Sequence, residues 1–399
     1  MSSDERDPPS EEMARGRRRR VRFERELDLL RIAAGRNEAQ REEAKALLRR
    51  RLVRWAVGVT GWIDAMRSRV RPSRAGREPG PAAASSPASP RITSTRPTLA
   101  IHIVPETWEI AETWGDTVFA RGLQTALERH GVSATVYVRS ELTTRASRNA
   151  DAALYLAGLD VPRTRRGQPS LLWIISHPDR VTARVVEPFD AVFVASEPFA
   201  QELEPRVTPP VRVLHQATDP ARFFPDPTGP HHELLFVGNS RDQRRPVLDA
   251  LEGTPHDLAI YGGKWRADLV DMRRVRGAWI PNDELRRYYS SADIVLADHW
   301  EDMRDEGFVA NRVFDALACG SFVISDDVLG LDALFGDAVP VFRDPGDLPD
   351  LVERFLADPA GRHERAERGR QAVLAGHTFD HRAAAIVDAI ERSRGTPRP

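Results

Sequence analysis

The chain has 399 residues, of which 41% are hydrophobic and 29% are charged, and its formal net charge is −1. This length is sufficient for two domains with cores of ordinary size. Basic residues are concentrated between Arg15 and Arg74, so the rest of the chain is acidic, which argues against nucleic acid as a ligand. The single cysteine, Cys319, excludes an intrachain disulfide framework and a cysteine zinc site. No apolar run approaches the roughly 20 residues that span a bilayer, so a cytoplasmic protein is expected.

The first segment, residues 1–71, is predicted to form a basic helical extension. Leucines and tryptophans recur there at helical intervals among arginines. The arginines beside the apolar stretch 55–63 suggest peripheral docking at the inner face of the cell membrane or contact with another protein, and a solvated arm is the alternative. A linker rich in Pro, Ala and Ser follows over 72–97.

From residue 98 onward, short apolar runs alternate with helical segments. Continuous apolar strands separated by helices are typical of parallel sheets covered on both faces. Two such series predict an α/β fold with two Rossmann-like, doubly wound domains that face a cleft, over 98–228 and 229–376. A terminal helix over 377–393 is expected to cross back to the first domain. The expected strands are 99–104, 134–138, 152–156, 171–175, 191–195, 234–237, 258–261, 278–280, 294–297, 322–324 and 339–342.

The segment 298–320 carries the clearest candidate site. Its expected helix, 309–319, begins after the strand 294–297, and ligands of open α/β sheets bind where strands end. The free N–H groups of a helix N-terminus suit a diphosphate, and Asn311 and Arg312 in the first turn add hydrogen-bond donors.

Two acids of this segment are candidate contacts for hydroxyl groups. Asp315 shares a helix face with Arg312 and can accept both hydroxyls of a ribose. Glu306, just before the helix, can accept those of a sugar. The five acids of the preceding loop do not have the spacing of a Ca²⁺ loop, so no metal is expected.

A resemblance to a known family rests on this segment. Residues 306–308 (EGF), followed by 314–320 (FDALACG), resemble the signature of group 1 glycosyltransferases of GT-B fold. Asn311 and Arg312 before the acid are more similar to the CgeB-like (spore maturation protein-like) branch. The resemblance extends to 235–241, 288–293 and 377–379.

This resemblance implies metal-independent transfer of a sugar from a nucleoside-diphosphate sugar to an acceptor hydroxyl. The first domain would bind the acceptor and the second the donor. The pattern departs from the family at one point, because eight residues instead of seven separate Glu306 from Asp315. The sugar-contacting role of Glu306 is therefore less well supported than the nucleotide-binding role of Asp315.

Three further loops of the second domain are candidates for donor binding. Arg241 can pair with a phosphate, and Lys264 could neutralise a diphosphate leaving group. Asn282 lies where GT-B enzymes line the base, although it could equally be the N-cap of a helix over 283–291. Arg244 and Arg245 are expected to be solvated helix residues. The candidate residues are Gly238, Asn239, Arg241, Lys264, Ile280 and Asn282.

In the first domain, Gly115 and Asp116 open a helix at the expected cleft. Gly115 lets the backbone approach a phosphate or the acceptor, whereas Asp116 could simply cap the helix. His177 follows the strand 171–175 and could contact the transferred sugar or act as a base, because imidazole titrates near neutrality. His299 in the donor segment is its rival, and a structural histidine is the alternative. The catalytic candidates are His177, Glu306 and Lys264.

The favoured function is therefore that of a hexosyltransferase-type enzyme, with a nucleotide sugar as co-substrate and no further cofactor. Its acceptor would be a cell-surface glycan, a glycolipid or a secondary metabolite, and the group 1 resemblance favours retention of the anomeric configuration. Two alternatives share the same cleft: a sugar-nucleotide epimerase of GT-B architecture, and a non-catalytic sugar-nucleotide-binding or assembly protein.

Overall fold

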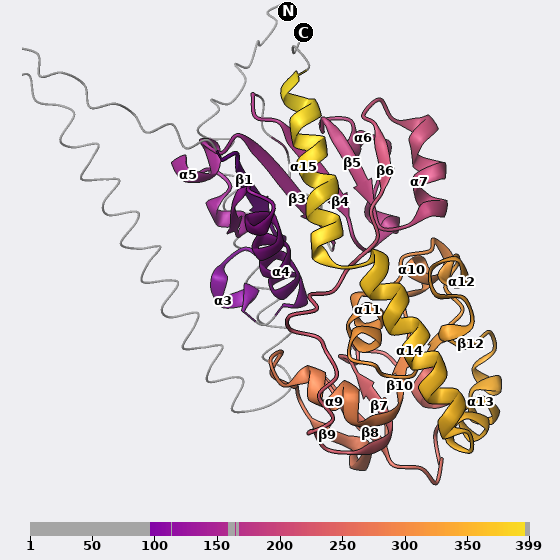
Figure 1. Cartoon of the computed structure of the whole chain (residues 1–399). Coiled ribbons are helices and arrows are strands. Elements are labelled where there is room, and N and C mark those ends of the chain that lie inside the picture. The colour runs from indigo at the N-terminus through magenta and orange to yellow at the C-terminus, as the bar shows by residue number, and fades with distance from the viewer. Residues whose placement is uncertain (1–95, 113, 159–163, 165–166, 396–399) are drawn as a thin grey trace, which may run out of the picture. The chain divides into compact units, whose positions relative to one another are not determined.

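The computed structural model describes residues 96–112, 114–158, 164 and 167–395 (Figure 1). The predicted extension, 1–71, and nearly all of the predicted linker, 72–97, lie outside these residues. Among the helices that the structure describes, none is both long and apolar enough to cross a bilayer.

The first half of the described chain forms a six-stranded parallel sheet. Its strands are β1 (Thr98–His102), β2 (Ser133–Tyr137), β3 (Ala152–Ala157), β4 (Ser170–Ile174), β5 (Ala191–Val194) and β6 (Val211–Val213), in the order β2-β1-β3-β4-β5-β6. Every residue of β3 and β4 is buried, as expected when both faces of the sheet are covered. The helices are α3 (Trp108–Ala111), α4 (Gly115–Arg129), α5 (Arg145–Arg148), α6 (Ala183–Val186) and α7 (Glu197–Leu203).

The second half repeats this arrangement with another six-stranded parallel sheet. Its strands are β7 (His232–Val237), β8 (Leu258–Tyr261), β9 (Val275–Gly277), β10 (Ala292–Ala297), β11 (Val323–Asp326) and β12 (Val341–Phe342), in the order β12-β11-β10-β7-β8-β9. Separate apolar clusters cover its two faces. The helices are α8 (Pro246–Asp249), α9 (Leu285–Ser291), α10 (Glu301–Asp305), α11 (Asn311–Ala318), α12 (Leu331–Phe335), α13 (Leu348–Leu356) and α14 (Pro359–Gly376).

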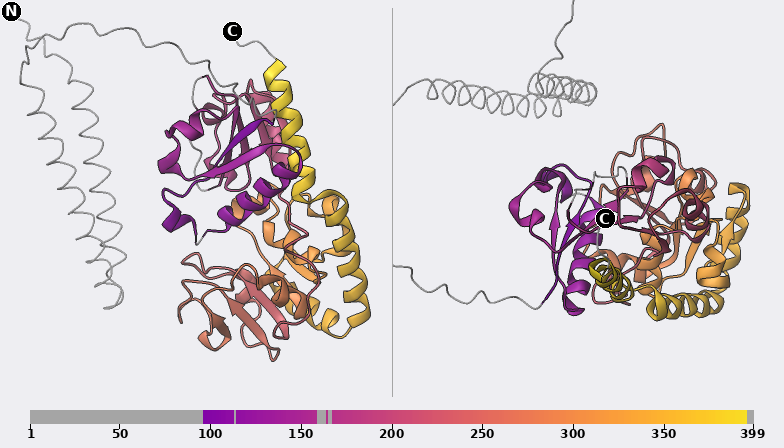
Figure 2. Two further views of the ribbon diagram at one scale, coloured as in Figure 1. Left: turned by 60° about the vertical axis from the view of Figure 1, so that its left-hand side comes forward. Right: turned by 90° about the horizontal axis from the view of Figure 1, so that it is seen from above.

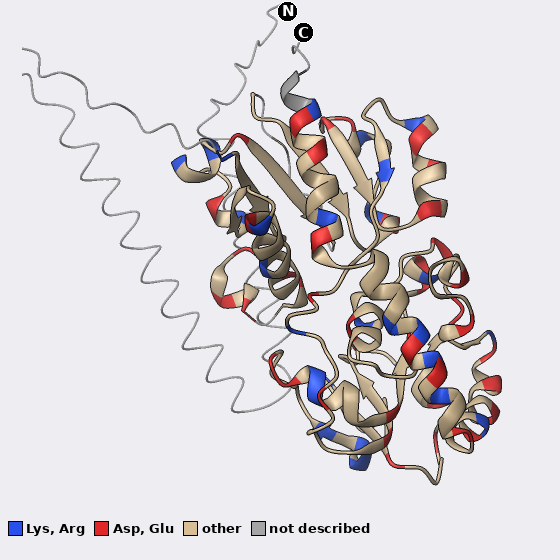
Figure 3. Ribbon diagram, in the orientation of Figure 1, with Lys and Arg blue, Asp and Glu red and all other residues tan. Residues whose placement is uncertain are grey.

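The last helix, α15 (Phe379–Gly395), returns to the first half of the described chain. Figures 1 and 2 show α14 along the second half and α15 along the first. Phe379 packs edge-on against Phe119 of α4, with ring centroids 4.8 Å apart. Charged residues lie along these outer helices, whereas the strands carry few of them (Figure 3). The apolar face of α15 packs into the core of the first sheet.

The two segments that cross between the halves are bonded to each other. Thr218 and Thr378 form a parallel bridge, in which the Phe379 N–H donates to the Thr218 carbonyl. The buried Arg382 guanidinium donates to the carbonyl oxygens of His215, Gln216 and Gly376 and to Nδ1 of His377. Burial lowers the pKa of Arg382 to about 10, so this clamp stays charged at neutral pH.

The two predicted Rossmann-like sheets are confirmed, but three local predictions are wrong. The ninth strand is β9, not 278–280, because the chain leaves the sheet at Gly277 and Trp279 is 70% exposed. The short edge strand β6 was not expected, since its Val213 is exposed. The acid-rich loop before α11 contains the helix α10.

Candidate functional site

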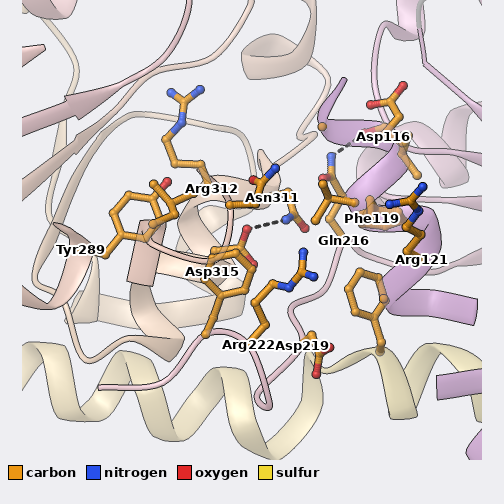
Figure 4. Close-up of a pocket in the computed structure, with 18 of the residues that line it drawn as sticks. Asp116, Phe119, Arg121, Gln216, Asp219, Arg222, Tyr289, Asn311, Arg312 and Asp315 are labelled. Carbon is orange, nitrogen blue, oxygen red and sulfur yellow. Dashed lines mark hydrogen bonds between the residues drawn. The ribbon is translucent and has the colours of Figure 1, made fainter. Parts of the chain in front are cut away.

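A cavity of about 340 Å³ lies between the two halves, where the strands of both sheets end (Figure 4). The first half contributes α4, including Gly115 and Asp116, together with Gln216 of the crossing segment. The second half contributes Asn282 and the first turns of α11. The lining from α11 consists of Asn311, Arg312 and Asp315, three residues that the sequence assigned to the donor.

Asp315 lies on the inner wall of this cavity and is 7% exposed. Its Oδ1 accepts a hydrogen bond of 2.7 Å from the Thr218 hydroxyl. Its Oδ2 accepts one of 2.7 Å from Nδ2 of Asn311 (Figure 4). Burial raises the pKa of Asp315 to about 7, although both hydrogen bonds oppose the rise. A carboxylate offers about four acceptor positions, so Asp315 retains capacity for hydroxyl donors of a ligand.

Two buried polar atoms of the α11 N-terminus have no hydrogen-bond partner within the described residues. They are Nη1 of Arg312 and Oδ1 of Asn311. The nearest carboxylate oxygen to that Arg312 nitrogen is Oδ1 of Asp298, 3.6 Å away, which is beyond hydrogen-bond range. Leaving such groups unpaired is costly, so both atoms point to a polar ligand at this helix start.

A cluster of arginine side chains lies near the α11 N-terminus, at the ends of β7 and β10. Three guanidinium groups, those of Arg241, Arg245 and Arg312, lie around the carboxylate of Asp298, and the charge of Asp326 also acts on Arg241 and Arg245. Arg245 is 2% exposed and pairs with Asp298, with 2.6 Å between Nε and Oδ2. Both Arg244 and Arg245 were predicted to be solvated. The prediction is wrong for Arg245, whereas the Arg244 side chain is half-exposed.

Arg241 belongs to this cluster, and its side chain contacts the ring of Trp300. Its guanidinium lies 4.2 Å from the centroid of the Trp300 ring. Burial, together with the charge of Arg245, lowers the pKa of Arg241 to about 9, so the group remains protonated at neutral pH. The cluster therefore has more positive than negative charge, which suits an anion such as a diphosphate.

The loops after β7 and β8 lock each other in place. Oδ1 of Asn239 accepts the Gly263 N–H at 2.7 Å, and the Ser240 hydroxyl donates to the Lys264 carbonyl at 2.7 Å. Gly262 has φ of 154°, and a Cβ there would overlap the Gly238 carbonyl. Gly238 in turn lies beside Nη2 of Arg312, so the loop borders the cluster.

Lys264 does not reach the arginine cluster by any contact that the structure describes. Its side chain is 69% exposed, and its ammonium pairs with Asp242 at 3.5 Å. The predicted neutralisation of a leaving group by Lys264 therefore has no support in this arrangement.

His299 lies inside the protein instead of facing the donor. Its side chain is 0% exposed, and Nδ1 lies 2.6 Å from Oδ1 of Asp326. Nε2 accepts the backbone N–H of Ala310, the N-cap residue of α11, at 2.8 Å. Both ring nitrogens are engaged, so the predicted donor contact is wrong. His299 holds the start of α11.

His177 lies at the junction of the halves, with Asp179 and Asp302. It has φ of 55°, a left-handed conformation that is uncommon in residues other than glycine. Its Nδ1 is 3.6 Å from Oδ2 of Asp302, and its ring centroid is 5.6 Å from that of Trp300. Burial lowers the pKa of His177, and burial and the adjacent Asp179 raise that of Asp302. The three side chains place an imidazole nitrogen and two carboxylates within 4.8 Å of one another.

Glu306 belongs to a different pocket from Asp315. That pocket, of about 690 Å³, lies between α7 and α10, and six of its 13 lining residues are acids, including Asp302. Burial and the neighbouring Glu202 and Asp305 raise the pKa of Glu306. The two acids that the family signature pairs therefore border separate cavities in this chain.

Asp116 of α4 faces the first cavity and does not cap its helix. Trp114 is the N-cap residue, without a side-chain hydrogen bond. Burial raises the pKa of Asp116 to about 6. Asn282 also lines the cavity but is not an N-cap, because α9 begins after Glu284. Ile280 is buried and does not line it.

Sequence reasoning missed four residues of this region: Thr218, Arg245, Asp298 and Asp302. Thr218 and Arg245 lie outside the family motif, and the partner of each is far away in the sequence. The signal that could have been used is the position of Asp298, directly after the buried strand β10. An acid at that position requires a cation nearby.

Solved structures with a similar fold include glycosyltransferases. Sucrose-phosphate synthase from Thermosynechococcus elongatus is 17% identical, with a TM-score of 0.57 over 74% of this chain and 99% of that chain. AviGT4, a glycosyltransferase involved in avilamycin A biosynthesis, is 18% identical, with a TM-score of 0.55 over 74% of this chain and 97% of that chain. HepE from Anabaena, solved with UDP and glucose, is 10% identical, with a TM-score of 0.53 over 73% and 99%. The described chain thus has the GT-B fold.

Sequence comparison finds a related family and one curated relative. Residues 241–388, which include α11 and the arginine cluster, match the family described as glycosyl transferase-like. Spore protein CgeB of Bacillus subtilis (strain 168) is 23% identical over 174 residues, 39% of this chain and 53% of CgeB. The match thus spans about half the length of that curated relative. In these sequence matches and in its GT-B fold, the chain is similar to group 1, CgeB-like glycosyltransferases.

Proposed function

We propose that this protein transfers a sugar from a nucleoside-diphosphate sugar to an acceptor hydroxyl. The start of α11 carries the proposal, because Arg312 and Asn311 present buried, unpartnered polar atoms beside Asp315. A diphosphate supplies acceptors for the guanidinium and the helix N–H groups, and ribose hydroxyls supply donors for the carboxylate. Structures of similar fold that were solved with UDP, including an alpha-glucosyltransferase, support this class of ligand.

In the proposed reaction, the bond between the anomeric carbon and the diphosphate oxygen breaks, and its electron pair stays on the diphosphate. The acceptor oxygen bonds to the anomeric carbon and loses its proton. Negative charge therefore grows on the diphosphate in the transition state. Arg241, which lies over the Trp300 ring, and Arg312, 3.6 Å from Asp298, would stabilise this charge by electrostatic attraction.

We propose that no metal is required, since the arginine cluster supplies the positive charge that a dication otherwise provides. His177, Asp179 and Asp302 are the one group of the described residues that could hold an ion. Turnover that is equal in EDTA and in Mg²⁺ or Mn²⁺ is the expected result. A rate that falls in EDTA and returns with Mn²⁺ would overturn this part of the proposal.

Donor screening tests the proposed function. The full chain is incubated with UDP-, GDP-, dTDP- and ADP-sugars, with and without a panel of glycan and lipid acceptors, and nucleoside diphosphate release is measured. We expect release from one class of donor and its loss in Asp315→Ala. Epimerised donor formed without any acceptor would instead support the epimerase alternative. Tight donor binding without any turnover would support a non-catalytic binding protein.

A separate proposal concerns the basic segment 1–71 and rests on its sequence alone. Its arginines and apolar stretch would dock the enzyme at the inner, anionic face of the cell membrane. Sedimentation of the full chain with phosphatidylserine vesicles should decrease as salt increases. Equal recovery with neutral vesicles would contradict membrane docking.

A further inference from the structure

The reaction centre of this enzyme needs a group that binds the hydroxyls of the transferred sugar. The family signature gives that role to Glu306, at the position where this chain departs from the usual spacing. The inference below rests on the proposed function. Two acids of the same short segment are candidates for this role. They are Asp302 within α10 and Glu306 directly after it.

The surroundings of Glu306 direct it away from the arginine cluster. Its carbonyl accepts a hydrogen bond from the Ser196 hydroxyl, which ties the backbone to α7. Gly307 then turns the chain with φ of 77°, and a Cβ at that position would lie 2.7 Å from the Leu329 carbonyl. The charged groups that act on the Glu306 carboxyl are Glu202, Asp305, Arg206 and Asp302. None of the three cluster arginines is among them.

Asp302 differs from Glu306 in its neighbours, because the charged groups that act on its carboxyl are His177 and Asp179. Its Oδ2 is buried and has no hydrogen-bond partner within the described residues, and Nδ1 of His177 lies 3.6 Å away. The side chain of Asp302 is 22% exposed and that of His177 is 13% exposed. Both are therefore partly shielded from water but still accessible to a ligand.

The His177–Asp302 pair also lies next to the proposed diphosphate site. The Trp300 ring contacts both sites. Its centroid is 5.6 Å from that of His177 and 4.2 Å from the Arg241 guanidinium. Arg241 is close enough to lower the pKa of His177 by its charge, as a smaller contribution than burial. A sugar bonded to a diphosphate at Arg241 would therefore extend toward this pair.

We propose that Asp302, together with His177, binds the hydroxyls of the transferred sugar, in place of Glu306. An ionised carboxylate accepts from sugar hydroxyls, and an imidazole can donate to one or accept from one. The same residues could also ligate a cation, because Asp302 and Asp179 favour positive charge at His177, whereas Arg180 and Arg241 oppose it. A cation site is therefore one outcome of the test.

The test compares two matched neutralising variants, Asp302→Asn and Glu306→Gln. The full chain is titrated with UDP and with UDP-glucose, and the turnover of the donor found by screening is measured. For Asp302→Asn we expect UDP affinity within about twofold of wild type and a loss of kcat/KM of about tenfold or more, as for a hydrogen bond to a charged group. Glu306→Gln should stay within about threefold in both measurements.

The outcomes separate this inference from the proposed function. If the wild type binds no nucleoside diphosphate, the proposed function fails. If it binds but Glu306→Gln loses turnover while Asp302→Asn keeps it, only the present inference fails. A requirement for Mn²⁺ that disappears in Asp302→Asn would also overturn it, in favour of a metal site. Should Asp302→Asn unfold, His177→Asn replaces it, with the same expected loss of turnover and retention of UDP binding.

Discussion

The first turns of α11 and the helix α10 just before it differ in how their acids are held. In α11, Asp315 is buried, accepts two hydrogen bonds and shares its cavity with Arg312. In α10 and after it, Asp302 and Glu306 are partly exposed and border a pocket lined by other acids. Acids that are close together in the sequence therefore have different environments and can have different roles. In the proposed account, the α11 side binds the diphosphate, and Asp302 on the α10 side accepts hydrogen bonds from sugar hydroxyls.

The largest effect is expected beneath α11, where Asp298 neutralises Arg245. Asp298→Ala would leave the Arg245 guanidinium, 2% exposed, without its counter-ion. We expect the free energy of unfolding to fall by about 3–5 kcal/mol, because an unpaired charge then stays buried. Urea denaturation measures this.

The control for this prediction is Asp327→Ala, which removes an exposed partner of Arg343. This variant should lower the free energy of unfolding by less than about 1 kcal/mol. Similar losses in both variants would contradict the view that the arginine cluster is a buried, fixed unit.

The next effect concerns ligand affinity at the α11 start. Arg312→Ala should weaken UDP binding by about tenfold to a hundredfold, because charge-assisted hydrogen bonds to phosphate are lost. The matched control is Arg304→Ala in α10, whose guanidinium is 40% exposed and pairs with Asp305. Calorimetric titration of both variants gives the comparison. An equal loss of affinity in the two variants would remove the phosphate site from α11.

A smaller effect should follow from the titration of Asp315. Its pKa is raised by burial to about 7, so the carboxyl is largely protonated below about pH 6 and ionised above about pH 8. The ionised form accepts from ribose hydroxyls, so UDP affinity should increase as pH rises through this range. Asp315→Asn removes the titration, while protonation of UDP itself affects both proteins equally. An affinity ratio between wild type and variant that does not change with pH would contradict this prediction.

The smallest effect is expected for Lys264→Ala. The side chain is 69% exposed and its ammonium pairs with Asp242, so we expect turnover to change by less than about threefold. A loss of kcat of a hundredfold or more would show that Lys264 moves into the site during the reaction.

Much of the fold could be predicted because each buried strand is a continuous apolar run, as in β3 and β10. The start of α11 was predictable for the same reason, since it follows such a strand. The pairing of Asp298 with Arg245 was not, because 53 residues separate them and only the sheet brings them together. The burial of His299 was equally hidden, since it depends on Asp326 of the adjacent strand. Likewise, the direction of the Glu306 side chain depends on the turn at Gly307 and the contact with Ser196.

The central claim is that α11 binds the nucleoside diphosphate of a sugar donor, and calorimetric titration of the wild type and Asp315→Ala tests it most directly. UDP, GDP, dTDP and ADP are the ligands, and circular dichroism confirms that the variant is folded. The account predicts that one of these nucleotides saturates the wild type and that folded Asp315→Ala binds it at least about tenfold more weakly. Absence of binding by all four nucleotides, or equal affinity in wild type and variant, would contradict it.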